Sequence, residues 1–176
     1  MLQCHIMKYS VLYFLLCFYL PAALAADDHL PMAQDLLQES RAAACKGQPY
    51  IVMFGSSTCP YCSVVRSLYL APLQDDPRYP GLVVREMEID SNQRVTDFSG
   101  DLQSMSRLAA SYGVSLVPQV MVFTADGEQV GKSLIGITTE DFYGYYLDEA
   151  IQLGMQAVRQ QAIVAPSALP GGYACD

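Results

Sequence analysis

The sequence has few of the residues that metal, haem and nucleic-acid sites require. Its only histidines are His5 and His29, and a zinc site would need a second Cys or His pair at ligand spacing. Lysine and arginine together number 10 against 18 aspartates and glutamates, and the resulting net charge of −8 argues against nucleic acid as a partner. The chain also shows no internal repeat. We therefore expect no resident metal, no cofactor and no nucleic-acid partner.

The apolar run at the N-terminus is too short to span a bilayer comfortably. This run, Ser10–Leu20, follows the positive charge of Lys8 and precedes Ala23-Leu24-Ala25, which fits the small-x-small cleavage rule. These features predict a signal peptide over residues 1–25, cleavage after Ala25 and export to the periplasm. An uncleaved membrane anchor remains the alternative.

The chain has six cysteines, of which signal cleavage would remove Cys4 and Cys17. An even number then remains, which fits an exported protein in an oxidising compartment. The remaining cysteines are Cys45, Cys59, Cys62 and Cys175.

Two of these cysteines stand where a predicted strand gives way to a predicted helix. Tyr50–Gly55 is a run of strand formers ended by glycine, as in strands buried on both faces, and Ser63–Leu70 has apolar residues at helical spacing. Cys59 can therefore cap the helix, with Pro60 at its first position. Unpaired N–H groups and the helix dipole favour a thiolate there. Cys62 falls in the same turn, so the pair suits thiol–disulfide exchange, with Cys59 attacking and Cys62 resolving.

Other uses of a Cys-x-x-Cys pair fit less well. A c-type haem needs histidine directly after the second cysteine, and this position is Ser63. A zinc site lacks its second ligand pair. A purely structural disulfide over three residues would be strained and reducible, which is itself a redox property. Zinc and a structural disulfide remain as alternatives.

The rest of the pattern predicts one domain over residues 26–164, for which 176 residues and 52% hydrophobic content supply enough core. Residues 165–176 are expected to form a flexible tail. Helices are predicted over 32–45, 63–70 and 104–112, and a last one opens at a capping box, Thr138–Asp141. Strands are predicted over 50–55, 82–90, 114–123 and 129–134, the last two joined by the hairpin turn Asp126-Gly127.

Two details of this pattern bear on the site and the core. The polar loop 91–103 leaves the sheet edge that carries Cys59, so we expect it to border the cysteine pair, with an idle insertion as the alternative. The apolar residues of the last helix are expected to face inward; they are Phe142, Tyr146, Leu147, Ala150, Ile151, Met155 and Val158.

Strand, Cys-Pro-Tyr-Cys, helix and a later strand carrying Val117-Pro118 resemble the thioredoxin superfamily, from about Leu30 to Arg159. The stretch through Gly136-Ile137 and Asp141–Leu147 is most similar to exported single-domain thioredoxins, such as those of bacterial sulfur-oxidation systems. The resemblance implies an α/β thioredoxin-like fold. Its central mixed sheet has parallel strands plus an antiparallel hairpin and is flanked by helices.

The resemblance also implies a substrate groove. In thioredoxin-like proteins the proline at the position of Pro118 is cis and faces the cysteine pair, and the residue before it, here Val117, pairs with the substrate backbone. Pro60 and Tyr61 complete the expected substrate-binding residues.

Two departures from thioredoxins are visible. A buried aspartate helps to deprotonate their resolving thiol, whereas this chain has Met53 at that position, and Thr58 replaces the tryptophan before the first cysteine. The proton of Cys62 could then pass to water or to a carboxylate of the 91–103 loop. No glutathione-binding Gly-Gly-x-Asp follows the Val-Pro strand, so glutaredoxin activity is not expected.

The resulting hypothesis is a monomeric periplasmic thiol–disulfide oxidoreductase that reduces disulfides of exported proteins. No large insertion separates Cys62 from Pro118, which leaves no room for the helical domain of disulfide-forming oxidases. A reductase in that compartment implies a membrane electron donor. The alternatives are an oxidase, or a metal chaperone or redox sensor without turnover.

The two outer cysteines have no local partner. In an oxidising compartment Cys45, at the end of the first helix, and Cys175, in the tail, can pair with each other across 130 residues. Two free thiols or a bridge between chains are the alternatives.

Overall fold

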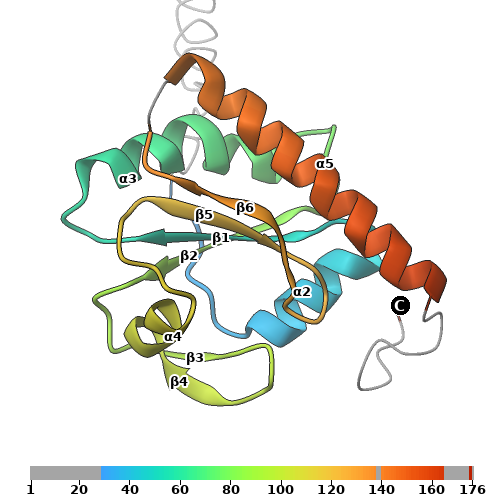
Figure 1. Ribbon diagram of the computed structural model, residues 1–176, viewed down its shortest axis with the longest axis horizontal. Helices are drawn as coiled ribbons and strands as arrows, with labels where there is room; N and C mark the ends of the chain where they lie inside the picture. The colour runs from blue at the N-terminus through green and yellow to red at the C-terminus, as the bar shows by residue number, and fades with distance from the viewer. Residues whose placement is uncertain (1–28, 138–139, 165–174, 176) are drawn as a thin grey trace, which may run out of the picture.

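A four-stranded mixed sheet forms the centre of the computed structural model, which describes residues 29–137, 140–164 and 175 (Figure 1). Its strand order is β2-β1-β5-β6, and β1 pairs in parallel with β2 and antiparallel with β5, as β5 does with β6. The strands are β1 (Tyr50–Gly55), β2 (Val83–Glu88), β5 (Gln119–Phe123) and β6 (Gln129–Ile135). The predicted signal segment, Thr138–Thr139 of the capping box and residues 165–174 and 176 lie outside the described residues.

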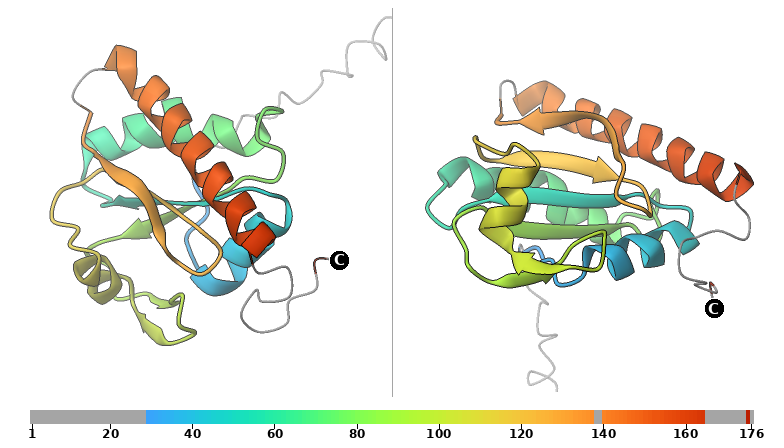
Figure 2. Two further views of the ribbon diagram at one scale, coloured as in Figure 1. Left: turned by 45° about the vertical axis from the view of Figure 1, so that its right-hand side comes forward. Right: turned by 60° about the horizontal axis from the view of Figure 1, so that its bottom comes forward.

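Helices cover both faces of this sheet (Figures 1 and 2). Helices α3 and α5 pack on one face around Met53, Cys62 and Ile151, while α2 and α4 pack on the other around Phe54 and Met105. Every residue of β1 is buried, as the continuous apolar run predicts. The helices are α2 (Leu36–Cys45), α3 (Pro60–Val65), the π-helical turn η1 (Arg66–Leu70), the 3₁₀ turn η2 (Ala71–Asp75), α4 (Met105–Ser111) and α5 (Glu140–Val164).

The first helix begins later than the sequence pattern predicts. Asp35 caps it, accepting a hydrogen bond of 2.8 Å from the Gln38 N–H, so helix α2 starts at Leu36 and not at Met32. The chain before it is extended along β2 instead: the Glu86 N–H donates to Pro31 O, and Met32 forms a bridge with Glu86.

The loop over 91–103 forms a small hairpin of β3 (Arg94–Thr96) and β4 (Leu102–Ser104). Its tip residue Phe98 packs against Tyr50 and Phe123, with ring centroids 6.1 and 5.1 Å apart. Tyr50 is the first residue of β1, whereas Cys59 follows the last. The expectation that this loop borders the cysteine pair is therefore wrong for its tip, because the packing of Phe98 against the two rings places the tip at the other end of the sheet.

Two aromatic residues of the predicted inward face of helix α5 point outward instead. Phe142 and Tyr146 are 57% and 50% exposed, while Tyr143 and Leu147 are buried. The buried stripe continues through Ile151 and Val158 as predicted. Tyr143 takes the inward place because its ring packs on that of Tyr69, 4.7 Å away between centroids.

The two glycines of α5 differ sharply in their surroundings, and this predicts opposite effects of alanine. A Cβ on Gly154 would lie 2.7 Å from Cβ of Pro49 and 2.7 Å from Cγ1 of Val122. We expect Gly154→Ala to lower the free energy of unfolding by about 1–3 kcal/mol through overpacking. A Cβ on Gly144 would meet only Tyr69, at 3.8 Å, so Gly144→Ala should raise it by up to about 1 kcal/mol through helix propensity. Urea unfolding measures both, and equal stability of the two variants would contradict the packing argument.

Candidate active site

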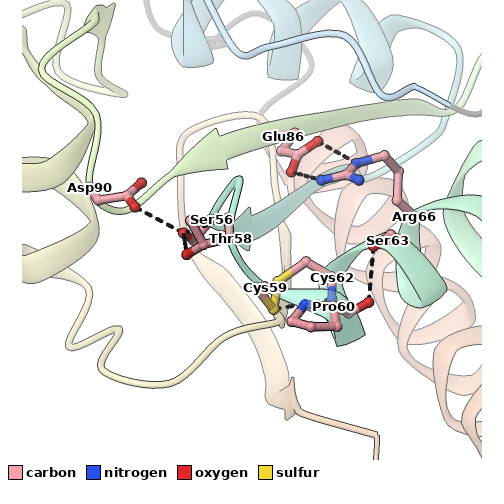
Figure 3. Close-up of a disulfide and its surroundings, with 9 residues drawn as sticks. All are labelled: Ser56, Thr58, Cys59, Pro60, Cys62, Ser63, Arg66, Glu86 and Asp90. Atoms are coloured by element: carbon pink, nitrogen blue, oxygen red, sulfur yellow. Dashed lines mark hydrogen bonds and ion pairs between the residues drawn. A yellow bond between two sulfur atoms is a disulfide. The ribbon is translucent and has the colours of Figure 1, made fainter.

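The junction of β1 and α3 positions the two cysteines of the motif. Cys59 is the N-cap of α3, with φ −93° and ψ 108°, and its sulfur accepts a hydrogen bond of 3.1 Å from the Cys62 N–H. Pro60 is the first residue of the helix, as the sequence predicts. Cys59 and Cys62 form a disulfide (Figure 3).

The two sulfurs differ in their access to solvent. Cys59 is half-buried, whereas Cys62 is completely buried and belongs to the core cluster under α3. An incoming disulfide can therefore reach only the first sulfur. The N–H group that now contacts Cys59 Sγ would stabilise a thiolate at the same place after reduction.

A small polar network holds the turn before Cys59. The Ser56 hydroxyl donates to Asp90 Oδ2 at 2.8 Å and lies 3.2 Å from the Thr58 hydroxyl, while Ser56 O accepts from the Cys59 N–H (Figure 3). Sequence reasoning missed this network. Ser56 directly follows β1 and Asp90 lies two residues after β2, so both stand at the carboxyl ends of parallel strands. This position is the signal that could have placed them together.

A buried ion pair lies next to the motif. Arg66 of η1 donates to both carboxylate oxygens of Glu86 on β2, from Nε to Oε2 at 2.7 Å and from Nη2 to Oε1 at 2.5 Å (Figure 3). Glu86 is only 5% exposed. The Ala71 N–H donates to Arg66 O, five residues back, so the helix widens just before Pro72, whose ring would clash with a regular turn.

A carboxylate of the 91–103 loop was expected to accept the proton of Cys62, but Asp97 of this loop accepts hydrogen bonds from its own hairpin. Asp97 accepts from the N–H groups of Ser99 and Asp101, at 2.8 and 2.9 Å, and from the Gln103 amide. Glu86 is instead the buried acid on the cysteine side of the sheet, on the strand next to Met53. The sequence shows that side chains of β2 alternate between the two faces of the sheet. Only the pairing of β2 with β1 shows that Glu86 lies on the face of Met53 and the cysteines.

The Val117–Pro118 peptide bond is cis. Gln119 pairs with Phe54 near the end of β1, which brings Pro118 to the sheet end that carries the cysteines. Pro118 is buried, and its carbonyl accepts from the Gly136 N–H at 2.7 Å. Val117 is half-buried and packs, like Cys59, against the core cluster that contains Cys62.

The surface around the motif is apolar in part. Tyr61 and Leu116 are each 65% exposed, and Pro60 is exposed as well. Tyr61 follows Pro60 in the motif, and Leu116 precedes Val117. A binding partner would therefore meet aromatic and aliphatic surface next to Cys59 and along the Val117 segment.

A disulfide joins Cys45 and Cys175, the pair considered from the sequence. Cys45 is the last residue of α2, shortly before β1 begins at Tyr50. Since Cys59 follows the other end of β1, this second disulfide takes no part in the Cys59–Cys62 site.

Neither a metal site nor a membrane-spanning helix is found in the described part of the chain. Between residues 29 and 164, Thr138 and Thr139 excepted, and at Cys175, no three His, Cys, Asp or Glu side chains gather closely enough to hold a metal ion. In the same part of the chain, no helix is both long and apolar enough to cross a membrane.

Comparison with known proteins gives one family match. The model of a thioredoxin-like domain matches residues 37–151, well over half of the chain. No curated protein matches.

Several solved structures are similar at low identity. Mitochondrial thioredoxin 3 of Saccharomyces cerevisiae is 17% identical with a TM-score of 0.47, over 70% of this chain and 93% of the other. A thioredoxin mutant of Halobacterium salinarum is 19% identical with a TM-score of 0.46, over 73% and 96%. The periplasmic thioredoxin SoxS of Paracoccus pantotrophus is 17% identical with a TM-score of 0.42, over 60% and 97%. We draw no functional conclusion from likenesses at this level.

Proposed function

The chain belongs to the family of thioredoxin-like domains, and we propose that it is a thiol–disulfide oxidoreductase that reduces disulfides of exported proteins in the periplasm. The observation that carries the proposal is the asymmetry of the pair: a half-buried, capping Cys59 before a fully buried Cys62. Thiol exchange needs this combination of one accessible, activated sulfur and one resolving sulfur held close behind it.

The reaction takes two exchange steps. The Cys59 thiolate attacks one sulfur of the substrate disulfide, and the other substrate sulfur leaves as a thiolate and takes a proton from water. The Cys62 sulfur loses its proton and attacks Cys59, which releases the second substrate sulfur. Two electrons pass to the substrate, and the protein is left with the Cys59–Cys62 disulfide.

The substrate would lie across the sheet end that carries the cysteines. There Val117 offers its backbone to an extended segment, and among the described residues no hydrogen-bond partner is found for that backbone. Pro60, Tyr61 and Pro118 would form the walls of the groove, since Pro60 and Tyr61 are exposed and Pro118 precedes β5. A strand-like segment bound in this way would present its disulfide to Cys59.

The size of the domain and the N-terminal sequence support the proposed direction and location. The segment between Cys62 and β5 holds only η1, η2, β2, the β3–β4 hairpin and α4, with no added helical domain of the kind found in oxidases. A reductase exported by the signal peptide 1–25 would need two electrons per cycle from a membrane donor. It would act as a monomer on folded or partly folded exported proteins.

The proposal is tested by turnover and by redox state. We expect the purified protein to accelerate the reduction of insulin by dithiothreitol, which a metal chaperone or redox sensor would not do. In periplasmic extracts quenched with acid and alkylated, Cys59 and Cys62 should be mostly reduced. A mostly oxidised pair together with turnover would identify an oxidase, and absence of turnover would refute the enzyme.

A further inference from the structure

The space beside Gly55 brings the buried carboxylate of Glu86 close to the resolving sulfur. A Cβ placed on Gly55 would lie 2.9 Å from Glu86 Oε1 and 3.7 Å from Cys62 Sγ, so these two atoms are within 6.6 Å of each other, the sum of the two distances. A separation within this limit can be bridged by one or two water molecules.

The register of the sheet explains why the acid lies there. Met53 of β1 and Glu86 of β2 are partners in the parallel pair, so their side chains share the face under α3. Met53 packs in the core cluster with Cys62. The carboxylate on this face therefore comes from the second strand, one position across the sheet from the apolar methionine.

Arg66 holds the carboxylate in place. It lies one helical turn after Cys62, at i+4, and donates to both oxygens of Glu86. A carboxylate as buried as Glu86 is costly unless a partner with good geometry compensates for its lost hydration. The bidentate pair supplies that compensation and fixes the oxygens toward Gly55.

We propose that Glu86, positioned by Arg66, receives the proton that the Cys62 thiol loses when it attacks the mixed disulfide; this rests on the thiol exchange proposed above. The proton moves from Cys62 Sγ to a Glu86 oxygen, directly or through bridging water, as the Cys62–Cys59 bond forms. The Cys59–substrate bond breaks and the substrate sulfur leaves as a thiolate. Glu86 then returns the proton to solvent, so that charge and electrons balance over the cycle.

The other polar groups around this space suit the role less well. Asp90 is exposed and accepts from Ser56, and Glu88, the next residue of β2 on this face, is half-exposed. Tyr143 of α5 lies in the same core cluster, but burial raises the pKa of its hydroxyl far above the ordinary value, so it stays neutral. Arg66 bears a positive charge, and Cys59 is bonded to the substrate at this stage. The side chains of β1 on this face, Ile51 and Met53, and that of Leu30 are apolar.

The attack by Cys59 and the attack by Cys62 can be measured separately when the reduced protein reacts with Ellman's reagent, 5,5′-dithiobis(2-nitrobenzoate). Attack by Cys59 releases one coloured thionitrobenzoate, and attack by Cys62 on the mixed disulfide releases a second. In Glu86→Gln we expect the second release to slow at least about tenfold at pH 7, in keeping with loss of a proton acceptor, while the first release changes less than about twofold. Between pH 6 and 8 the second rate of the variant should rise about tenfold per unit, as for a thiol of ordinary pKa near 8.5, and that of the wild type less steeply.

A matched control is available on the other face of β2. Glu39 of α2 forms a second Glu–Arg pair, with Arg85 Nε at 3.1 Å, and Arg85 neighbours Val52 in the opposite cluster. Glu39→Gln should leave both releases and their pH profiles unchanged. An equal slowing in both variants would show a general loss of structure and overturn the proposal.

The double variant Glu86→Gln/Arg66→Met covers the case in which the single variant fails to fold. Replacing a buried pair as a unit is often tolerated, whereas removing one partner leaves a buried charge. The role of Glu86 would be overturned if the variant that folds released the second thionitrobenzoate as fast as the wild type. The same pH profile as the wild type would also overturn it. If even the wild type gave no first release, the proposed function itself would fail, and this outcome is distinct.

Discussion

Replacing Cys59 by serine is expected to lower insulin reduction by at least about 10³-fold, because the variant lacks the only sulfur of the pair that a substrate can reach. The remaining Cys62 is fully buried and cannot begin an exchange. Insulin turbidity with dithiothreitol as reductant measures the loss. Since Oγ of serine can still cap α3, the fold should be preserved, and the circular dichroism spectrum should match that of the wild type.

Replacing Cys62 by serine should abolish turnover in a different way. The Cys59 thiolate still attacks, but no thiol follows to resolve the mixed disulfide, so the covalent complex with insulin accumulates and is visible on a non-reducing gel. The double variant Cys45→Ser/Cys175→Ser, which removes the distant disulfide and leaves no free thiol there, is the control and should form no such complex. Turnover by Cys62→Ser at the wild-type rate would contradict the assignment of the resolving sulfur.

Loss of the Cys45–Cys175 disulfide should have the largest effect on stability. The bridge closes a loop of 130 residues, for which chain entropy in the unfolded state gives an upper limit of about 4–5 kcal/mol. We expect Cys45→Ser to lower the free energy of unfolding by several kcal/mol but by less than this limit, because ordering the end of the chain opposes the gain. Denaturant unfolding of the oxidised proteins provides the measurement.

The Cys45–Cys175 prediction has an internal control. Cys175→Ser and the double variant should match Cys45→Ser, since each removes the same bridge. Insulin reduction should be retained in all three, because the bridge lies at the other end of β1 from Cys59. Peptide mapping without reduction must show a Cys45–Cys175 cross-link; an alkylatable Cys175 in freshly isolated protein, or three variants of unequal stability, would refute it.

Features set by a few neighbouring residues could be predicted from the sequence. The continuous run Tyr50–Gly55 suits only a strand buried on both faces, and Cys59 before Pro60 can cap a helix without any distant contact. The turn Asp126-Gly127 is equally local, since Gly127 has the positive φ of +84° that this hairpin needs. For this reason the exchange motif, its strand and its helix appear where the residues predict them.

Rotations and registers were decided by the tertiary structure. The sequence gives α5 an apolar side but cannot distinguish Tyr143 from Phe142, which stand one position apart; the contact of Tyr143 with Tyr69 selects the first. Likewise, the sequence of the hairpin after β2 is that of a polar loop. The packing of Phe98 against Tyr50 places the tip of this hairpin away from the cysteines. In each case the neighbouring residues allow two orientations of nearly equal stability, and a contact between residues far apart in the chain determines which one forms.

At the site itself, the position of Glu86 was likewise determined by the tertiary structure and not by the sequence alone. The sequence shows that Met53 stands where a thioredoxin has its buried acid. It does not show whether the acids of the following strand, Glu86 and Glu88, share the face of Met53, because β2 also carries the charged Arg85 on its other face and the register with β1 is not known from the sequence. Pairing of Met53 with Glu86 places that carboxylate under α3, and Arg66 can reach it only because the helix has the right rotation. A strand's side chains alternate with a period of two, so a shift of the register by one residue would have turned Glu86 to the opposite face.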